Sequence, residues 1–111
     1  MRTKLIVGNW KMNGSHFLID RINDAISSKV DKKNLEIVIC PPDVLLYNAK
    51  NLFEKSGIFV GSQNVHSEPN GAFTGETSAL LLRECGINWC IVGHSERREF
   101  FGETDDLIRK K

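Results

Sequence analysis

The sequence predicts an α/β fold in which one parallel sheet of four strands alternates with helices along the chain. Four short, mainly apolar runs rich in β-branched residues predict the strands, at residues 5–9, 36–40, 58–63 and 89–94. Because these runs are nearly continuous rather than alternating, they suit strands buried on both faces, as in a parallel sheet. The segments between them show helical spacing, so strands and helices are expected to follow one another in turn.

The first predicted helix follows from apolar residues that recur every three or four positions over residues 18–30. The second begins after two prolines at 41–42 end the preceding strand, with Asp43 as the expected capping residue. Its buried stripe lies within residues 43–53, and Gly57 ends it.

A third, shorter helix is expected to open at residue 77 or 78, to turn Ala79, Leu82 and Cys85 inward and to close at Gly86. The connection before it, residues 64–76, is longer than usual, and such connections are generally functional or packed on a partner.

The last residues of the chain predict the start of one more helix. Thr104, followed by two aspartates, is a good helix start, but only residues 107–111 follow them. We therefore expect the sequence to be interrupted within its fourth helix.

Composition narrows the function classes. The 111 residues carry 15 basic and 14 acidic side chains, a formal charge of +1, which indicates no nucleic acid and no membrane as partner. The three cysteines, Cys40, Cys85 and Cys90, form no CxxC pair and have no histidine at ligand spacing, so we expect reduced, mostly core-facing thiols and no metal. Without a recognisable signal peptide or transmembrane segment, the expected location is the cytoplasm.

Polar residues follow three of the predicted strands. Asn9 and Lys11 follow the first, Gln63 and Asn64 the third, and His94 and Glu96 the fourth. In a parallel sheet these carboxyl ends lie on one side, where α/β folds place their active sites.

Less specific interpretations apply to the same residues. Lys11 is equally compatible with a solvated surface lysine, and His94 with a hydrogen-bonded structural histidine. Residues 96–98 (ERR) are compatible with a charged turn and an exposed ion pair of little energetic value.

Three motifs together resemble one enzyme family. They are residues 8–14 (GNWKMNG), 71–76 (GAFTGE) and 92–98 (VGHSERR), and residues 63–65 (QNV) and 102–105 (GETD) add to them. The sequence resembles the triosephosphate isomerase family over essentially its whole length.

The resemblance implies a (β/α)₈ barrel of about 250 residues. Residues 1–111 would be the N-terminal part of that barrel and a single incomplete domain: three βα units, the fourth strand and the start of the fourth helix. We also expect Val7, Ile39, Val60 and Val92 to fill the barrel interior.

The resemblance also implies a reaction and residue roles. Family members interconvert dihydroxyacetone phosphate and D-glyceraldehyde 3-phosphate, small phosphorylated trioses, by proton transfer through an enediolate, without a cofactor. By similarity His94 is a neutral electrophile at a helix N-terminus, where the helix dipole disfavours its cation. Lys11 supplies positive charge to the substrate, Asn9 a hydrogen bond, and Glu96 orients the lysine.

By the same resemblance the complete enzyme is a homodimer. The loop over residues 71–76 would project into the partner subunit with Thr74 at its tip, and Glu76 and Arg97 would pair across the interface. The family's glutamate base, mobile lid and phosphate-binding loops belong to the second half of the barrel. We therefore expect the isolated 111-residue chain to be inactive or nearly so.

Two alternatives stay open at this point. One is a non-catalytic half-barrel that dimerises with itself or with a full-length enzyme through residues 71–76. The other is a small flavodoxin-like binding domain, which is disfavoured because no GxGxxG or GxxxxGK[ST] loop follows any predicted strand.

Overall fold

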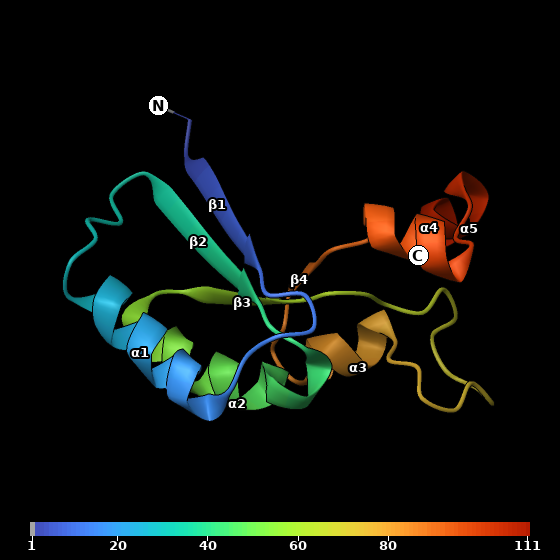
Figure 1. The fold of residues 1–111 in the computed structure, drawn as a ribbon, viewed down its shortest axis with the longest axis horizontal. Coiled ribbons are helices and arrows are strands. Elements are labelled where there is room, and N and C mark those ends of the chain that lie inside the picture. The colour runs from blue at the N-terminus through green and yellow to red at the C-terminus, as the bar shows by residue number, and fades with distance from the viewer. Residues whose placement is uncertain (1) are drawn as a thin grey trace.

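The computed structural model describes residues 2–111 and places four parallel strands side by side in one curled sheet (Figure 1). In chain order and in spatial order the strands are β1 (Lys4–Asn9), β2 (Leu35–Cys40), β3 (Phe59–Ser62) and β4 (Trp89–Cys90). The predicted parallel α/β architecture is confirmed, and its form is that of a half-barrel.

Helices connect the strands in the predicted order. They are α1 (His16–Ser27), α2 (Asp43–Phe53) with a following 3₁₀ turn η1 (Glu54–Ser56), α3 (Ala79–Glu84), α4 (Ser95–Phe101) and α5 (Asp105–Lys110). Figure 1 shows α1 and α2 packed together on one side of the sheet, whereas α4 and α5 lie together at the other end of the molecule. Among residues 2–111, no helix combines the length and the apolar character needed to cross a bilayer.

The helix starts follow from side-chain capping. Ser15 accepts a hydrogen bond from the Leu18 N–H at 3.0 Å, and Ser78 and Thr104 cap α3 and α5 in the same way. The prediction that Asp43 caps α2 is wrong, because Pro42 occupies the cap position without a side-chain bond. Asp43 is instead the first helical residue. At this position the positive end of the helix dipole stabilises its negative charge.

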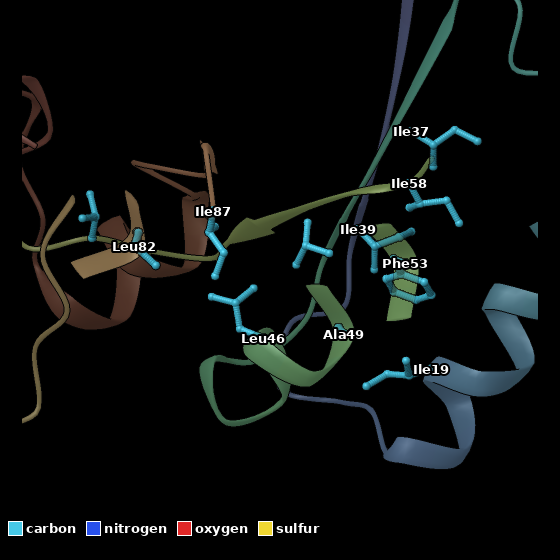
Figure 2. Packing of buried hydrophobic residues seen from close by; sticks show 11 residues of the cluster. Ile19, Ile37, Ile39, Leu46, Ala49, Phe53, Ile58, Leu82 and Ile87 are labelled. Carbon is cyan, nitrogen blue, oxygen red and sulfur yellow. The ribbon is translucent and has the colours of Figure 1, made fainter. Parts of the chain in front are cut away.

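The hydrophobic core lies between the sheet and the α1–α2 layer. In Figure 2, Ile39 of β2 lies beside Phe53 of α2, with Ala49 of α2 and Ile19 of α1 close by, and Ile37 of β2 lies beside Ile58. Phe53, Ala49 and Ile19 are completely buried. This packing holds the sheet and the two helices together as two layers.

Two residues expected inside the barrel belong to this core instead. Ile39 and Val60 are paired in the sheet and both join the cluster beneath the helices, so their placement on the inner face was wrong. Val7 pairs with Val38, the residue before Ile39, and is 46% exposed. Val92 is 43% exposed. Side chains alternate between faces along a strand, which separates Val7 from Ile39.

The last strand and the cysteines also differ from expectation. Only residues 89–90 pair as β4, because the chain turns at Gly93, which has φ 68°, and leads His94 into α4. Cys40 is buried as expected, but Cys85 and Cys90 are exposed. Of the three residues expected inward on α3, Leu82 alone is buried.

Candidate active site

The polar residues that follow the strands converge on one cleft. Asn9, Lys11, Gln63, His94 and Glu96 all line a space of about 520 Å³ at the carboxyl ends of the strands. Asn9 ends β1, Gln63 follows β3 directly, and His94 is the N-cap residue of α4. The convergence predicted from strand ends is therefore present in the structure.

Lys11 has an uncommon backbone conformation. Its φ is 55°, in the left-handed region that a residue with a side chain seldom adopts. The side chain of Asn9 accepts a hydrogen bond from the Lys11 N–H at 2.9 Å. The conformation costs about 1–2 kcal/mol relative to an ordinary one, so neighbouring contacts must hold it.

Lys11 and Glu96 form an ion pair across the cleft. The Lys11 Nζ lies 2.5 Å from Glu96 Oε1, and the two side chains are 53% and 38% exposed. The hydrogen bond from Lys11 is the main reason that the pKa of Glu96 lies below its usual value, and the charge of Lys11 acts in the same direction. Glu96 is thus kept as a carboxylate that fixes the lysine ammonium.

His94 is placed by the first turn of α4. The Glu96 N–H donates to His94 Nδ1 at 3.4 Å, and Glu96 Oε2 lies 3.3 Å from the same nitrogen. The backbone donor requires a lone pair on Nδ1, which leaves the proton of a neutral ring on Nε2.

A buried charged cluster holds α4 in place. Glu103 is 7% exposed, and its Oε2 accepts hydrogen bonds from Arg97 Nε at 2.7 Å and from Lys111 Nζ at 2.6 Å. Lys111 also donates to Asn64 Oδ1 at 2.7 Å, and the Arg97 guanidinium lies 4.6 Å from the Phe101 ring centre. Burial raises the pKa of Glu103, but the bonds from Lys111 and Arg97 outweigh it and lower that pKa overall.

Sequence reasoning missed this cluster. From the sequence, Glu103 belongs to the GETD motif at residues 102–105, and the motif assigns it no role. Its neighbours in sequence do not distinguish a buried carboxylate from a surface one, since both acidic and basic residues are frequent over residues 95–111. The signal in the sequence is Gly102: in the structure it has φ 65° and turns the chain so that Glu103 points back toward Arg97.

The three residues predicted for a subunit interface occupy different surroundings. Thr74 lies in an exposed turn and does not line the cleft. Glu76 lines the cleft, 4.0 Å from His66 Nδ1, and Arg97 binds Glu103 of its own chain. Pairing of Glu76 with Arg97 across an interface therefore stays a prediction.

The cleft carries both signs of charge. Lys11 and Arg97 contribute positive charge, and Asp43, Glu76 and Glu96 negative charge. Burial raises the pKa of Asp43, a hydrogen bond from Ser62 opposes this shift, and the charge of Glu76 adds to it. Within residues 2–111 no three His, Cys, Asp or Glu side chains are grouped so as to hold a metal ion.

Comparison with known proteins shows the family. The family model described as triosephosphate isomerase matches residues 4–111. The triosephosphate isomerase of Alkaliphilus metalliredigens is 43% identical over 111 residues, and that of Carboxydothermus hydrogenoformans is 43% identical over 112. The Psychromonas ingrahamii protein of the same name is 40% identical over 112 residues.

These alignments cover 100% of this chain and 45% of each relative, so the chain spans a little under half the length of the proteins it matches. The matched part carries the curled parallel sheet and the cleft at its carboxyl edge. By sequence and by fold, the chain belongs to the triosephosphate isomerase family.

Proposed function

We propose that residues 1–111 contribute the substrate-polarising part of a triosephosphate isomerase site. The reaction is the interconversion of dihydroxyacetone phosphate and D-glyceraldehyde 3-phosphate, in which a proton moves between adjacent carbons through an enediolate. The observation that carries the proposal is the meeting of Lys11 with His94 and Glu96, which lie more than 80 residues further along the sequence, in one cleft.

Each residue has a chemical task in this proposal. Removing a proton beside a carbonyl places negative charge on the carbonyl oxygen, which a preorganised N–H donor stabilises. His94 donates from Nε2, because its Nδ1 accepts the backbone N–H of Glu96. Lys11 supplies a positive charge for the phosphate and the enediolate, and Asn9 hydrogen-bonds a substrate oxygen.

Glu96 has a supporting role. Its carboxylate binds the Lys11 ammonium and so limits the positions that this long side chain can take. A lysine placed in advance loses less conformational freedom when the substrate binds. We therefore assign Glu96 as the residue that orients Lys11.

Other parts of the family's chemistry lie outside these residues. The glutamate base, the lid and the phosphate-binding loops implied by the resemblance belong to the second half of the barrel. A positioned base contributes about 10²- to 10⁴-fold to such a proton transfer. We propose that the base comes from such a second half, and that the complete enzyme is a homodimer using Thr74, Glu76 and Arg97 at its interface.

A chimera tests the proposal. Residues 1–111 are joined to the part of the Alkaliphilus metalliredigens enzyme that lies beyond the aligned region. Deuterium incorporation into dihydroxyacetone phosphate in D₂O, followed by NMR, measures proton transfer directly. We expect the chimera to be active and to lose at least about 10²-fold in rate with His94→Gln or Lys11→Met.

Matched variants control for nonspecific effects. His16→Gln and Lys29→Met change the same residue types at exposed positions on or next to α1, away from the cleft. These two variants should keep the activity of the unsubstituted chimera. Full activity in His94→Gln or Lys11→Met would remove the role assigned to that residue.

The cytoplasmic location is likewise a proposal. It rests on the three free cysteines, since reduced thiols are typical of proteins in reducing compartments.

A further inference from the structure

The loop that carries Lys11 is held from three directions by side chains. Asn9 binds the Lys11 N–H, Glu96 binds Nζ, and Gln63 Nε2 donates to the Lys11 carbonyl oxygen at 2.8 Å. Gln63 is distant in sequence, 52 residues away. Of these three contacts, the one from Gln63 anchors the peptide that follows the strained residue.

Gln63 makes a second bond from the same nitrogen. Its Nε2 also donates to the carbonyl oxygen of Cys40 at 2.8 Å, and Cys40 is the last residue of β2. That same carbonyl accepts the Trp10 N–H at 3.0 Å. The Gln63 amide therefore ties the loop after β1 to the carboxyl ends of both β2 and β3.

The chemistry of these two contacts admits few side chains. Carbonyl oxygens only accept hydrogen bonds, so the group between them must supply two N–H donors from one position. The primary amide of Gln63 does this, whereas a carboxylate of the same size has no donor and would face two negative oxygen dipoles. A hydrocarbon side chain of the same length would leave both carbonyls without this partner.

We propose that Gln63 is the positioning residue that holds Lys11 in its left-handed conformation and so directs its ammonium into the cleft. The inference rests on the proposed function for the task of Lys11, but the geometric role of Gln63 is separate from it. When Gln63 is replaced by a side chain without donors, the backbone of Lys11 relaxes to negative φ. Its Nζ then leaves Glu96.

The first experiment measures the Lys11 backbone in the 111-residue chain itself. A residue with positive φ gives a strong intraresidue NOE between its amide and α protons, and a residue with negative φ gives a weak one. We expect the strong signal at Lys11 in the native chain and its loss in Gln63→Met and Gln63→Glu. A strong signal retained in both variants would overturn the proposal.

Asn13 provides a matched control. Its Nδ2 donates to the Trp10 carbonyl at 3.1 Å, so it is also a side-chain amide bound to a backbone carbonyl of this loop. Asn13→Leu should keep the strong NOE at Lys11. If both Gln63 variants fail to fold while Asn13→Leu folds, Gln63 is a general structural residue and the proposal is wrong.

The second experiment asks whether Gln63 acts through Lys11. In the active chimera, Gln63→Met should reduce kcat/KM by about 10²-fold, the scale expected when a reacting group is displaced by about 1 Å. When Lys11→Met is already present, Gln63→Met should reduce it little further. Losses that multiply fully in the double variant would show an independent effect and contradict the proposal.

The two experiments also separate this inference from the proposed function. If the unsubstituted chimera is inactive, the proposed function fails, and the NMR result still decides whether Gln63 sets the Lys11 backbone. If the chimera is active and Lys11 is unchanged in the Gln63 variants, the proposed function stands and the positioning role fails.

Discussion

The Nζ atom of Lys11 lies 2.5 Å from Oε1 of Glu96, although 85 residues separate them in sequence. Lys11 follows the first strand, and Glu96 lies in the first turn of α4, after the last strand of the sheet. The ion pair therefore joins the beginning and the end of the described sheet at its carboxyl edge. His94 lies beside the same carboxylate. Glu96 therefore contacts both Lys11 and His94, the two groups that the proposed chemistry needs.

The ion pair predicts a titration. The pKa of Glu96 lies below its usual value mainly because of the Lys11 hydrogen bond. In Lys11→Met it should rise toward its usual value, measured by NMR of the side-chain carboxyl carbon, while Lys29→Met should leave it unchanged. Because the folded-state pKa is lowered, any stability from this pair is present above the unfolded-state pKa and is lost as the pH falls through the folded-state value. An unchanged pKa in Lys11→Met would contradict the assignment.

The buried cluster around Glu103 predicts a stability change. Glu103→Gln removes the negative charge between Arg97 and Lys111, and breaking a buried pair in this way costs about 3 kcal/mol or more. Urea unfolding at pH 7 should show this loss, whereas Glu68→Gln, at an exposed position, should unfold like the native chain. Equal unfolding midpoints for Glu103→Gln and the native chain would contradict the structural role.

The same cluster has a defined pH dependence. The pKa of Glu103 is lowered in the folded state, so its contribution is fully present above roughly pH 5 and declines as the pH falls through the folded-state pKa. The difference in unfolding free energy between the native chain and Glu103→Gln should therefore shrink in acid. A difference that grows as the pH falls would reverse the sign of this argument.

The cysteines predict an order of chemical modification. Burial, together with the charge of Cys90, raises the pKa of the Cys40 thiol to about 11, so at pH 8 only about one in 10³ of these groups is the reactive thiolate. Cys85 is exposed, and iodoacetamide should modify it first and Cys40 last, as measured by peptide mass spectrometry. In urea all three should react at similar rates. Equal rates for Cys40 and Cys85 in the folded chain would contradict the burial of Cys40.

The sequence predicted the order of elements because helical and strand periodicities differ clearly, but it did not predict which face of the sheet each residue occupies. Strands buried on both faces carry apolar residues at successive positions, so Ile39 and Val60 had no alternation to mark their side. The turn at Gly93 depends on a positive φ, and glycine adopts both signs of φ readily. The early end of β4 was therefore not visible in composition.

The candidate site was predictable to a similar extent. The rule that carboxyl ends of parallel strands share one edge placed Asn9, Lys11 and His94 together, and the structure brings them into one cleft. The partners of Arg97 were not predictable, because a charged residue in a helix has several neighbours of opposite sign and the three-dimensional path selects one. The role proposed for Gln63 likewise depends on two carbonyl oxygens whose positions only the fold defines.

The sheet face opposite the helices predicts self-association. Leu5 and Val7 lie on one face of β1 and are 48% and 46% exposed. The register carries this face through Val38, which is buried, to Phe59, which is 45% exposed. Exposed apolar residues on the face of a sheet favour association because contact removes them from water. Sedimentation velocity at micromolar concentration should detect species larger than 12.5 kDa.

Charge substitutions locate the surface responsible. Val7→Lys places a charge within the apolar face and should shift the population toward monomer, since burying an unpaired charge is costly. Val44→Lys makes the same change on α2, at a side chain that is 89% exposed and far from that face, and should leave the association unchanged. If the native chain is instead a single monomer at micromolar concentration and unfolds cooperatively, this face does not drive association. That result would contradict the prediction.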